Sequence, residues 1–244
     1  MSNHRFHCPG DLRPGQLVTL PSMESSHALK VLRLRPGETV TLLNGRGDTA
    51  EAVLQASADG RRLHDACCLV GDVVSVPAPT RPVRLYVAPP KSHNMELVLK
   101  SATELGVSRI TPIVCQHGVS RGEAASKATW QGYLVAALKQ SGNPWLPELT
   151  PAMTLREAIA ADDSAVGYLG AVPRDGEQPA AAPWRRPLGV TALWIGPEGG
   201  FTEEEERLLR AHGCLPLTVG DWILRVETAV AALLGCLSLR QPDD

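Results

Sequence analysis

The first third of the chain alternates short apolar runs with turn residues, a pattern typical of β-strands. The runs are 16–20, 38–43, 50–55 and 67–70, and the turn signals between them are Asn44-Gly45, Asp59-Gly60 and Gly71-Asp72. One helical segment, 25–34, interrupts the runs, because Leu29, Val31 and Leu32 gather on one side of it. The pattern predicts a small antiparallel barrel that carries one helix.

A proline-rich stretch at 77–82 marks the point where this pattern changes. Closely spaced prolines cannot continue a strand or a helix, so we expect a stiff linker there. Beyond it, strands are expected at 83–88, 110–115, 165–169 and 190–195, and helices at 95–105, 130–141 and 154–160. This alternation predicts an α/β fold whose mostly parallel sheet has helices on both faces. The predicted domains are therefore 1–76 and 83–244, joined by the linker.

The stretch 194–202 combines a buried strand, a turn with three glycines and the start of a helix. Glycines let backbone groups approach a ligand closely, whereas a plain strand-to-helix connection needs only one or two of them. Thr202 and Glu205 form a capping box, which predicts where the helix begins. The loop has neither the dinucleotide-binding nor the P-loop spacing, and the four acids 203–206 would repel a phosphate. The stretch therefore predicts a loop for a ligand that does not bind there through phosphate.

A second strand-to-helix connection lies at 219–229. Its strand ends at Gly220, and an Ala/Leu-rich helix runs on to Leu239 with Arg225 and Glu227 at its start. Taken alone, a surface ion pair at a helix end explains these two residues best.

Together, the two segments resemble a known signature. The sequence Ile-Gly-Pro-Glu-Gly-Gly-Phe at 195–201, followed by Gly-x-x-Ile-Leu-Arg-x-Glu-Thr-Ala at 220–229, is similar to that of the RsmE-type ribosomal RNA methyltransferases of the SPOUT superfamily. The resemblance extends upstream to 95–112, to 140–148 and to the residues around 27–38, so it covers essentially the whole chain.

The resemblance implies a fold and a reaction. The fold would be a PUA-like, RNA-binding β-barrel at 1–76 before a SPOUT domain at 83–244 that contains a deep trefoil knot, and the protein would be a homodimer. The reaction would transfer a methyl group from S-adenosylmethionine to N3 of a uridine in 16S rRNA of the small ribosomal subunit. The residues implied to bind the cofactor are Thr111, Pro112, Ile195, Gly196, Pro197, Glu198, Gly199, Gly200, Val219, Gly220, Ile223, Leu224 and Arg225.

Three residues are candidates for the chemistry of such a transfer. Uridine N3 carries a proton and is a poor nucleophile until that proton leaves, so a base or a cation that stabilises the anion is needed. Arg225 suits the charge that develops at a uracil carbonyl, and Glu198 or Glu227 could accept the proton or orient Arg225. The sequence does not choose between the two acids. Several positions also depart from the family pattern, among them the turn Ser92-His93-Asn94, and Asn143, Trp222 and Val226.

Charge is nearly balanced along the chain as a whole. There are 24 Lys and Arg against 26 Asp and Glu, a net charge of -2, which excludes RNA binding by bulk charge alone. Residues 1–36 are locally basic, with five Lys and Arg against two acids, a net +3. The candidate RNA-binding residues are Arg5, Arg13, His27, Lys30, Arg33 and Arg35.

Other functional classes find less support in the sequence. The six cysteines contain no C-x-x-C pair, and His4, His7 and Cys8 read better as part of a strand than as ligands, so no metal is expected. No leader and no run of ~20 apolar residues is present, which predicts a cytoplasmic protein without a membrane contact. Two alternatives remain open. The chain could methylate another RNA position, tRNA included, or it could be a non-catalytic RNA-binding or ribosome-assembly protein that keeps the fold.

Overall fold

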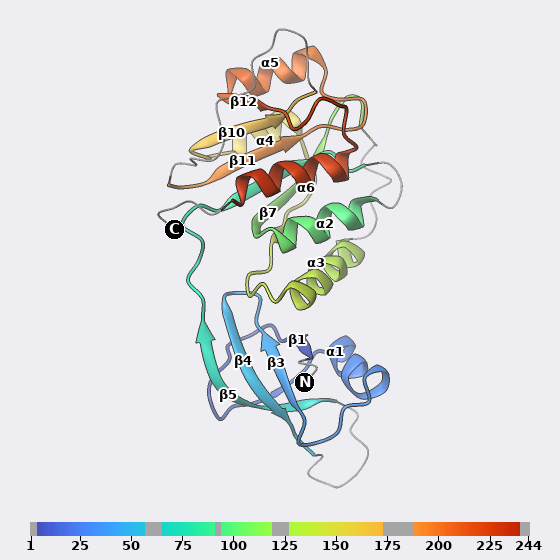
Figure 1. Cartoon of the computed structure of the whole chain (residues 1–244), viewed down its shortest axis with the longest axis vertical. Coiled ribbons are helices and arrows are strands. Elements are labelled where there is room, and N and C mark those ends of the chain that lie inside the picture. The colour runs from blue at the N-terminus through green and yellow to red at the C-terminus, as the bar shows by residue number, and fades with distance from the viewer. Residues whose placement is uncertain (1–3, 57–64, 91–93, 119–126, 173–187, 240–244) are drawn as a thin grey trace. The chain divides into compact units, whose positions relative to one another are not determined.

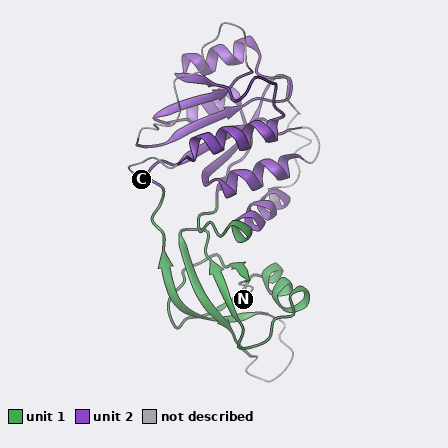
Figure 2. Cartoon of the chain, in the orientation of Figure 1, with its two compact units in different colours: residues 1–78, 138–146 green, residues 79–137, 147–244 purple. Residues whose placement is uncertain are grey.

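The computed structural model describes residues 4–56, 65–90, 94–118, 127–172 and 188–239. The chain divides into two compact units (Figures 1 and 2). Unit 1 consists of Met1–Ala78 and Leu138–Leu146, and unit 2 of Pro79–Ala137 and Pro147–Asp244. The boundary near 78 falls in the expected linker, but the sequence pattern placed 138–146 in the second domain.

Unit 1 is built on a five-stranded sheet with the order β1-β3-β4-β5-β2. Its elements are β1 (Arg5–His7), β2 (Leu17–Thr19), α1 (Ser22–Ser26), the π-helix η1 (His27–Val31), β3 (Thr39–Leu43), β4 (Asp48–Leu54) and β5 (Cys67–Ser75). The sheet is mixed and not purely antiparallel as expected, because β1 pairs with β3 in parallel. Phe6, Leu42, Leu54 and Cys68 are fully buried in its core.

Strand β5 runs through the dipeptide Gly71-Asp72, where a turn was expected. Ala50 pairs with Val73 and Ala52 with Val70, so two residues of β5 lie opposite the single residue Glu51. This is a β-bulge, and glycine suits it because a Cβ at Gly71 would lie 3.1 Å from the Glu51 carbonyl oxygen. A local turn signal thus marks a bend within a strand here, because pairing with β4 continues on both sides of it.

The helical segment begins and ends earlier than the expected 25–34, because α1 starts at Ser22 and η1 stops at Val31. Val31 is 66% exposed, so it does not share the buried side with Leu29 and Leu32. After the helix, Arg33 adopts a φ of 56°, the left-handed conformation. This brings the Leu34 N–H to within 3.0 Å of the Ala28 carbonyl oxygen, which closes the helix end.

The returning segment of unit 1 is tied to its sheet by charged and aromatic side chains. Arg5 donates hydrogen bonds to the carbonyl oxygens of Lys139 and Gln140, at 3.2 and 2.9 Å. Lys139 forms an ion pair of 2.7 Å with Glu24, whose side chain is 10% exposed. The ring of Trp145 packs against Gly47. These contacts explain why 138–146 belongs to unit 1 although its neighbours in sequence do not.

Unit 2 is an α/β domain with a seven-stranded sheet, and every strand pair in it is parallel. The order is β12-β10-β11-β6-β7-β8, with β9 beside β7. The strands are β6 (Val83–Val87), β7 (Val107–Val114), β8 (Glu148–Leu149), β9 (Met153–Thr154), β10 (Val166–Gly170), β11 (Thr191–Ile195) and β12 (Cys214–Leu217). The helices are α2 (Met95–Glu104), α3 (Lys127–Ser141), α4 (Leu155–Ala161), α5 (Glu203–Ala211) and α6 (Val226–Leu237). The predicted alternation of strands and helices is confirmed.

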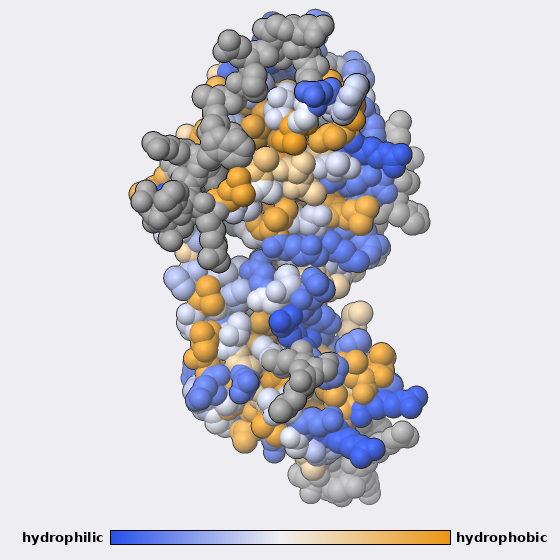
Figure 3. All heavy atoms as spheres, in the orientation of Figure 1, coloured by the Kyte–Doolittle hydropathy of each residue, from blue (hydrophilic) through white to orange (hydrophobic). Residues whose placement is uncertain are grey.

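Helices cover both faces of this sheet (Figure 1). On one face, α2 and α6 pack side by side, α2 on β7 and α6 on β11. On the other, Leu155 of α4 and Leu209 of α5 join a core with Tyr86 and Trp194, whose rings stack at 3.8 Å. The visible surface of each unit mixes apolar and polar side chains (Figure 3). No helix within the described residues is long and apolar enough to cross a membrane.

Candidate functional site

A pocket of about 190 Å³ opens where the neighbouring strands β10, β11 and β12 end. Because these strands are parallel, the segments that follow them meet at one edge of the sheet, which is where ligands bind in open α/β folds. The last residue of each strand and residues that follow it line the pocket. They are Gly170–Val172 from β10 onward, Ile195–Phe201 from β11 onward, Leu217, Val219 and 222–224 from β12 onward, and Glu206, Val226, Ala229 and Leu233 from the adjacent helices. The three-glycine loop and the second strand-to-helix connection, which are far apart in sequence, therefore form one site.

The three-glycine loop is a tight turn. The Gly200 N–H donates to the Pro197 carbonyl oxygen at 2.8 Å, and Gly200 takes a φ of +73°. A Cβ at Gly196 would lie 3.1 Å from the Phe201 nitrogen, and one at Gly199 would lie 3.0 Å from the His117 Cβ. The glycines thus allow the loop to fold back on itself and to lie close to the segment after β7.

The start of α5 confirms the predicted capping box. Thr202 accepts a hydrogen bond from the Glu205 N–H at 3.2 Å, and the Glu205 carboxylate accepts one from the Thr202 N–H at 2.9 Å. The same carboxylate also accepts a hydrogen bond from the Gln116 N–H at 2.9 Å. Glu205 therefore joins the segments that follow β7 and β11. Next to it, burial and the Glu205 charge raise the pKa of Cys115 to about 12, so this thiol stays protonated.

Most of the expected cofactor-binding residues come together in the pocket, but four do not line it. The lining residues among them are Ile195, Gly196, Pro197, Glu198, Gly199, Gly200, Val219, Ile223 and Leu224. Thr111 and Pro112 lie inside β7, paired with β6, and Thr111 is 2% exposed. Gly220 and Arg225 are not among the residues that line the cavity, although residues next to them in sequence are. A sequence motif does not distinguish a residue that faces a cavity from one that faces the sheet.

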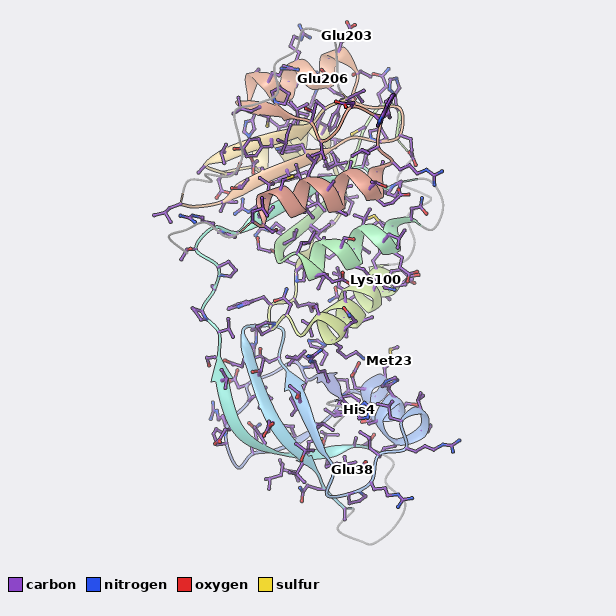
Figure 4. The ribbon with its side chains drawn as sticks, viewed as in Figure 1. His4, Met23, Glu38, Lys100, Glu203 and Glu206 are labelled. Carbon is purple, nitrogen blue, oxygen red and sulfur yellow. The ribbon has the colours of Figure 1, made fainter. Side chains whose placement is uncertain are left out.

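Some residues that line the pocket were not among those expected from the sequence. Gly170 ends β10 and Ala171 and Val172 follow it, and their position at the end of a parallel strand beside β11 was the available clue. Glu206 lies on α5 (Figure 4) and lines the same pocket. Trp222 also lines it, although its side chain is 80% exposed.

The candidate catalytic residues lie at and beside the pocket. Glu198 lines it, whereas Arg225 is the N-cap residue of α6 and is exposed. The Arg225 carbonyl oxygen accepts a hydrogen bond of 2.8 Å from the Ala229 N–H within α6. Its guanidinium has no hydrogen bond or ion pair with any residue that the structure describes, so a pair with Glu227 is not formed. Glu227 instead accepts a hydrogen bond of 3.0 Å from the Asn94 amide, a residue that the sequence analysis noted only as a departure.

The candidate RNA-binding residues lie at three places in unit 1. His27, Lys30, Arg33 and Arg35 are all exposed and lie on η1 and the turn after it. Arg13 lies on another loop, where Asp11 pairs with it at 3.6 Å and with Arg46 at 2.9 Å. Arg5 is engaged with the end of α3, as described above. No group of three or more His, Cys, Asp or Glu side chains among the described residues could hold a metal ion.

Comparisons with known families agree with this architecture. The model of an RNA methyltransferase domain matches residues 77–238, and that of an RNA methyltransferase PUA domain matches residues 22–64. The chain belongs to this RNA methyltransferase family.

Individual members of the family are similar over nearly the whole chain. Ribosomal RNA small subunit methyltransferase E from Mycobacterium bovis is 30% identical over 92% of this chain and 87% of its own. A solved structure from Legionella pneumophila, in complex with the bound cofactor SAM, has a TM-score of 0.85 at 30% identity and covers 97% of both chains. The Neisseria gonorrhoeae ribosomal RNA small subunit methyltransferase E bound to S-adenosyl methionine has a TM-score of 0.83 at 30% identity and covers 96% of both.

Proposed function

We propose that this protein transfers a methyl group from S-adenosylmethionine to N3 of a uridine in 16S rRNA of the small ribosomal subunit. One observation carries the proposal: the three-glycine loop and the loop before Arg225 form one pocket at the ends of β10, β11 and β12. The names of the similar enzymes from Mycobacterium bovis and Neisseria gonorrhoeae support methylation of small-subunit ribosomal RNA, and the choice of uridine N3 follows from the family resemblance.

The residues of the pocket fit the proposed cofactor. Gly196, Gly199 and Gly200 leave parts of the loop backbone without a side chain over them, and Ile195, Leu217 and Leu233 add an apolar wall. Such a surface suits a nucleoside that carries no phosphate and whose cationic sulfonium chain the nearby acids can tolerate. The acids at the start of α5 agree with this choice, since they would oppose a phosphate. When bound, S-adenosylmethionine supplies an electrophilic methyl group on a sulfonium ion.

The chain's own residues would then act on the uridine. We assign Glu198 as the acceptor of the N3 proton, because it lines the pocket whereas Glu227 is held by Asn94 outside it. Arg225 has no competing partner among the described residues, and its guanidinium can stabilise the negative charge that the uracil carbonyl gains as the proton leaves. Glu227 is thus a positioning residue at the start of α6. The rigid loops align the nucleophile with the methyl group, which lowers the entropic part of the barrier.

The PUA domain would hold the RNA. Its exposed cations His27, Lys30, Arg33 and Arg35, with Arg13 on a second loop, supply contacts to phosphates. The expected partner is therefore the 16S rRNA or the small subunit that contains it, and the expected compartment is the cytoplasm.

We also propose the homodimer and the deep trefoil knot that the family resemblance implies. Val230, Leu233, Leu234 and Leu237 are buried within the chain itself, so the apolar stripe of α6 covers its own sheet and α2. A dimer through α6 would have to use its other face, where Ala231 and Ala232 are only half-buried and permit close helix approach. Light scattering at micromolar protein tests the dimer, and a monomer would contradict it.

Methylation of purified rRNA tests the reaction. The protein is incubated with S-adenosylmethionine and with small subunits or 16S rRNA from cells that lack it, and the RNA is digested and analysed by mass spectrometry. We expect one new 3-methyluridine at a single position. A methyl group on another nucleotide would favour a different RNA target, and binding of the cofactor without any transfer would favour the non-catalytic alternative.

A further inference from the structure

Two large apolar side chains are exposed to solvent at the rim of the pocket. Trp222 is 80% exposed and Ile223 is 76% exposed, yet both line the pocket. Tryptophan is highly buried on average in folded proteins, so an exposed one beside a functional cavity indicates a surface that another molecule covers. The loop that carries them is short and is anchored on both sides, by β12, which ends at Leu217, and by α6, which begins at Val226.

The charges next to Trp222 restrict what that molecule is. Asp221 precedes it and is exposed, so the site disfavours a phosphate group. Arg225 follows three residues later and is exposed without a partner among the described residues, so it can bind a carbonyl oxygen. A flat, neutral ring with carbonyl groups at its edge is compatible with both charges, because it brings no negative charge near Asp221 and offers an acceptor to Arg225. An unpaired nucleobase has this chemistry, and bases stack on exposed aromatic side chains in many RNA-binding proteins.

We infer that Trp222 stacks on an unpaired base of the RNA substrate and holds it at the mouth of the pocket. This inference rests on the proposed function, because it makes the stacked base the uridine that is to be methylated. Trp222 would act as a specificity residue, since an aromatic face accepts a base only after it has left its helix. A base that remains paired would not reach the pocket.

Intrinsic fluorescence tests the contact directly. The probe is a single-stranded oligouridylate of about twelve nucleotides, with a matched strand of abasic nucleotides. We expect the oligouridylate to quench the emission of the wild-type protein and the abasic strand to leave it unchanged. Trp222→Phe should lose the quenching while its affinity stays within about threefold, whereas Trp222→Ala should bind about tenfold more weakly. Trp130→Phe, which removes a buried tryptophan of α3, is the control and should still be quenched.

Three results would overturn the inference. Equal quenching of the wild type and Trp222→Phe would show that the ring does not meet the bases. A loss of affinity of Trp222→Ala for S-adenosylhomocysteine in calorimetry would place the ring on the cofactor. Dissociation of Trp222→Ala into monomers in light scattering would place it in a contact between two copies of the chain. The quenching needs no methyl transfer, so failure of the proposed reaction and failure of the stacking are separate outcomes.

Discussion

The Asn94 side-chain amide donates a hydrogen bond of 3.0 Å to the Glu227 carboxylate and so connects the first turns of two helices. Asn94 is the N-cap residue of α2, and Glu227 lies in the first turn of α6. The carboxylate also complements the positive end of the α6 dipole. The bond therefore fixes the start of α6, and with it the backbone that carries Arg225.

Removing this bond should slow the reaction without affecting the cofactor. We expect Asn94→Ala to lower the single-turnover methylation rate about tenfold or more, because small displacements of catalytic groups are costly. Its affinity for S-adenosylhomocysteine should be unchanged in calorimetry. The control is Lys100→Ala, on the same helix (Figure 4). It breaks only the surface ion pair with Glu96 and should keep the wild-type rate. A wild-type rate for Asn94→Ala would mean that the bond is only structural.

Arg225 should matter more for turnover than for binding. If it stabilises charge on the uracil, Arg225→Ala should reduce the single-turnover rate by ~10²-fold or more, with a modest change in RNA affinity. Glu227→Gln keeps an oxygen that can accept the Asn94 bond and should retain most of the rate, whereas Glu198→Gln should not. Near wild-type rates for Arg225→Ala and Glu198→Gln together would remove both residues from the mechanism.

Gly199 should tolerate no side chain. A Cβ there would already lie 3.0 Å from the His117 Cβ, and the two methyl groups of valine add to this crowding, so Gly199→Val should push the glycine loop and the segment of His117 apart. We expect calorimetry to detect no S-adenosylhomocysteine binding to this variant. Gly132→Ala, on α3, meets no atom within 4 Å and is the matched control. Normal binding by Gly199→Val would argue against this loop as the cofactor site.

Arg33 should show opposite effects on stability and on RNA binding. Its φ of 56° is strained for any residue with a Cβ, so Arg33→Gly should raise the free energy of unfolding by about 1 kcal/mol. The same change removes a cation and should flatten the salt dependence of RNA binding by about one unit. Arg35→Ala should flatten the salt dependence without stabilising the protein. If the salt dependence of RNA binding is unchanged in both variants, other basic side chains bind the RNA phosphates.

Stability should fall steeply in alkaline solution. Burial raises the pKa of Cys68, Cys115, Cys214 and Tyr86 to about 12. Between pH 9 and about 12 the unfolded chain loses these protons while the native chain keeps them, so the free energy of unfolding decreases as pH rises. Urea unfolding with a reductant at about pH 8 and about pH 10 should reveal this decrease, and Cys214→Ala should reduce it. Equal urea midpoints at both pH values would contradict the raised pKa values of these four side chains.

The sequence predicts the parts of the fold that depend on local periodicity and capping. The parallel sheet of unit 2 and the start of α5 at the Thr202–Glu205 box were both foreseen, because neighbouring residues determine them. Contacts between residues that are distant in the sequence were not foreseen. The bulge at Gly71 depends on pairing with Glu51, and the Asn94 bond depends on a residue far along the chain.

The candidate site shows the same division. The sequence motif located the glycine loop, but it also included Thr111 and Pro112, which the β6–β7 pairing holds inside the sheet. It gave no weight to Gly170, because the position of a residue at the end of a parallel strand becomes informative only when the strand order is known.

The return of residues 138–146 to unit 1 means that a single cut in the linker cannot separate the two units intact. A fragment ending at Ala78 would leave the Glu24 carboxylate buried without Lys139 and the Arg5 guanidinium without its carbonyl partners. Recombination between related genes would meet the same obstacle. A unit 1 inherited from another parent needs its own copy of this nine-residue segment, so an exchange that keeps both units stable requires crossovers on both sides of 138–146 as well as one near 78.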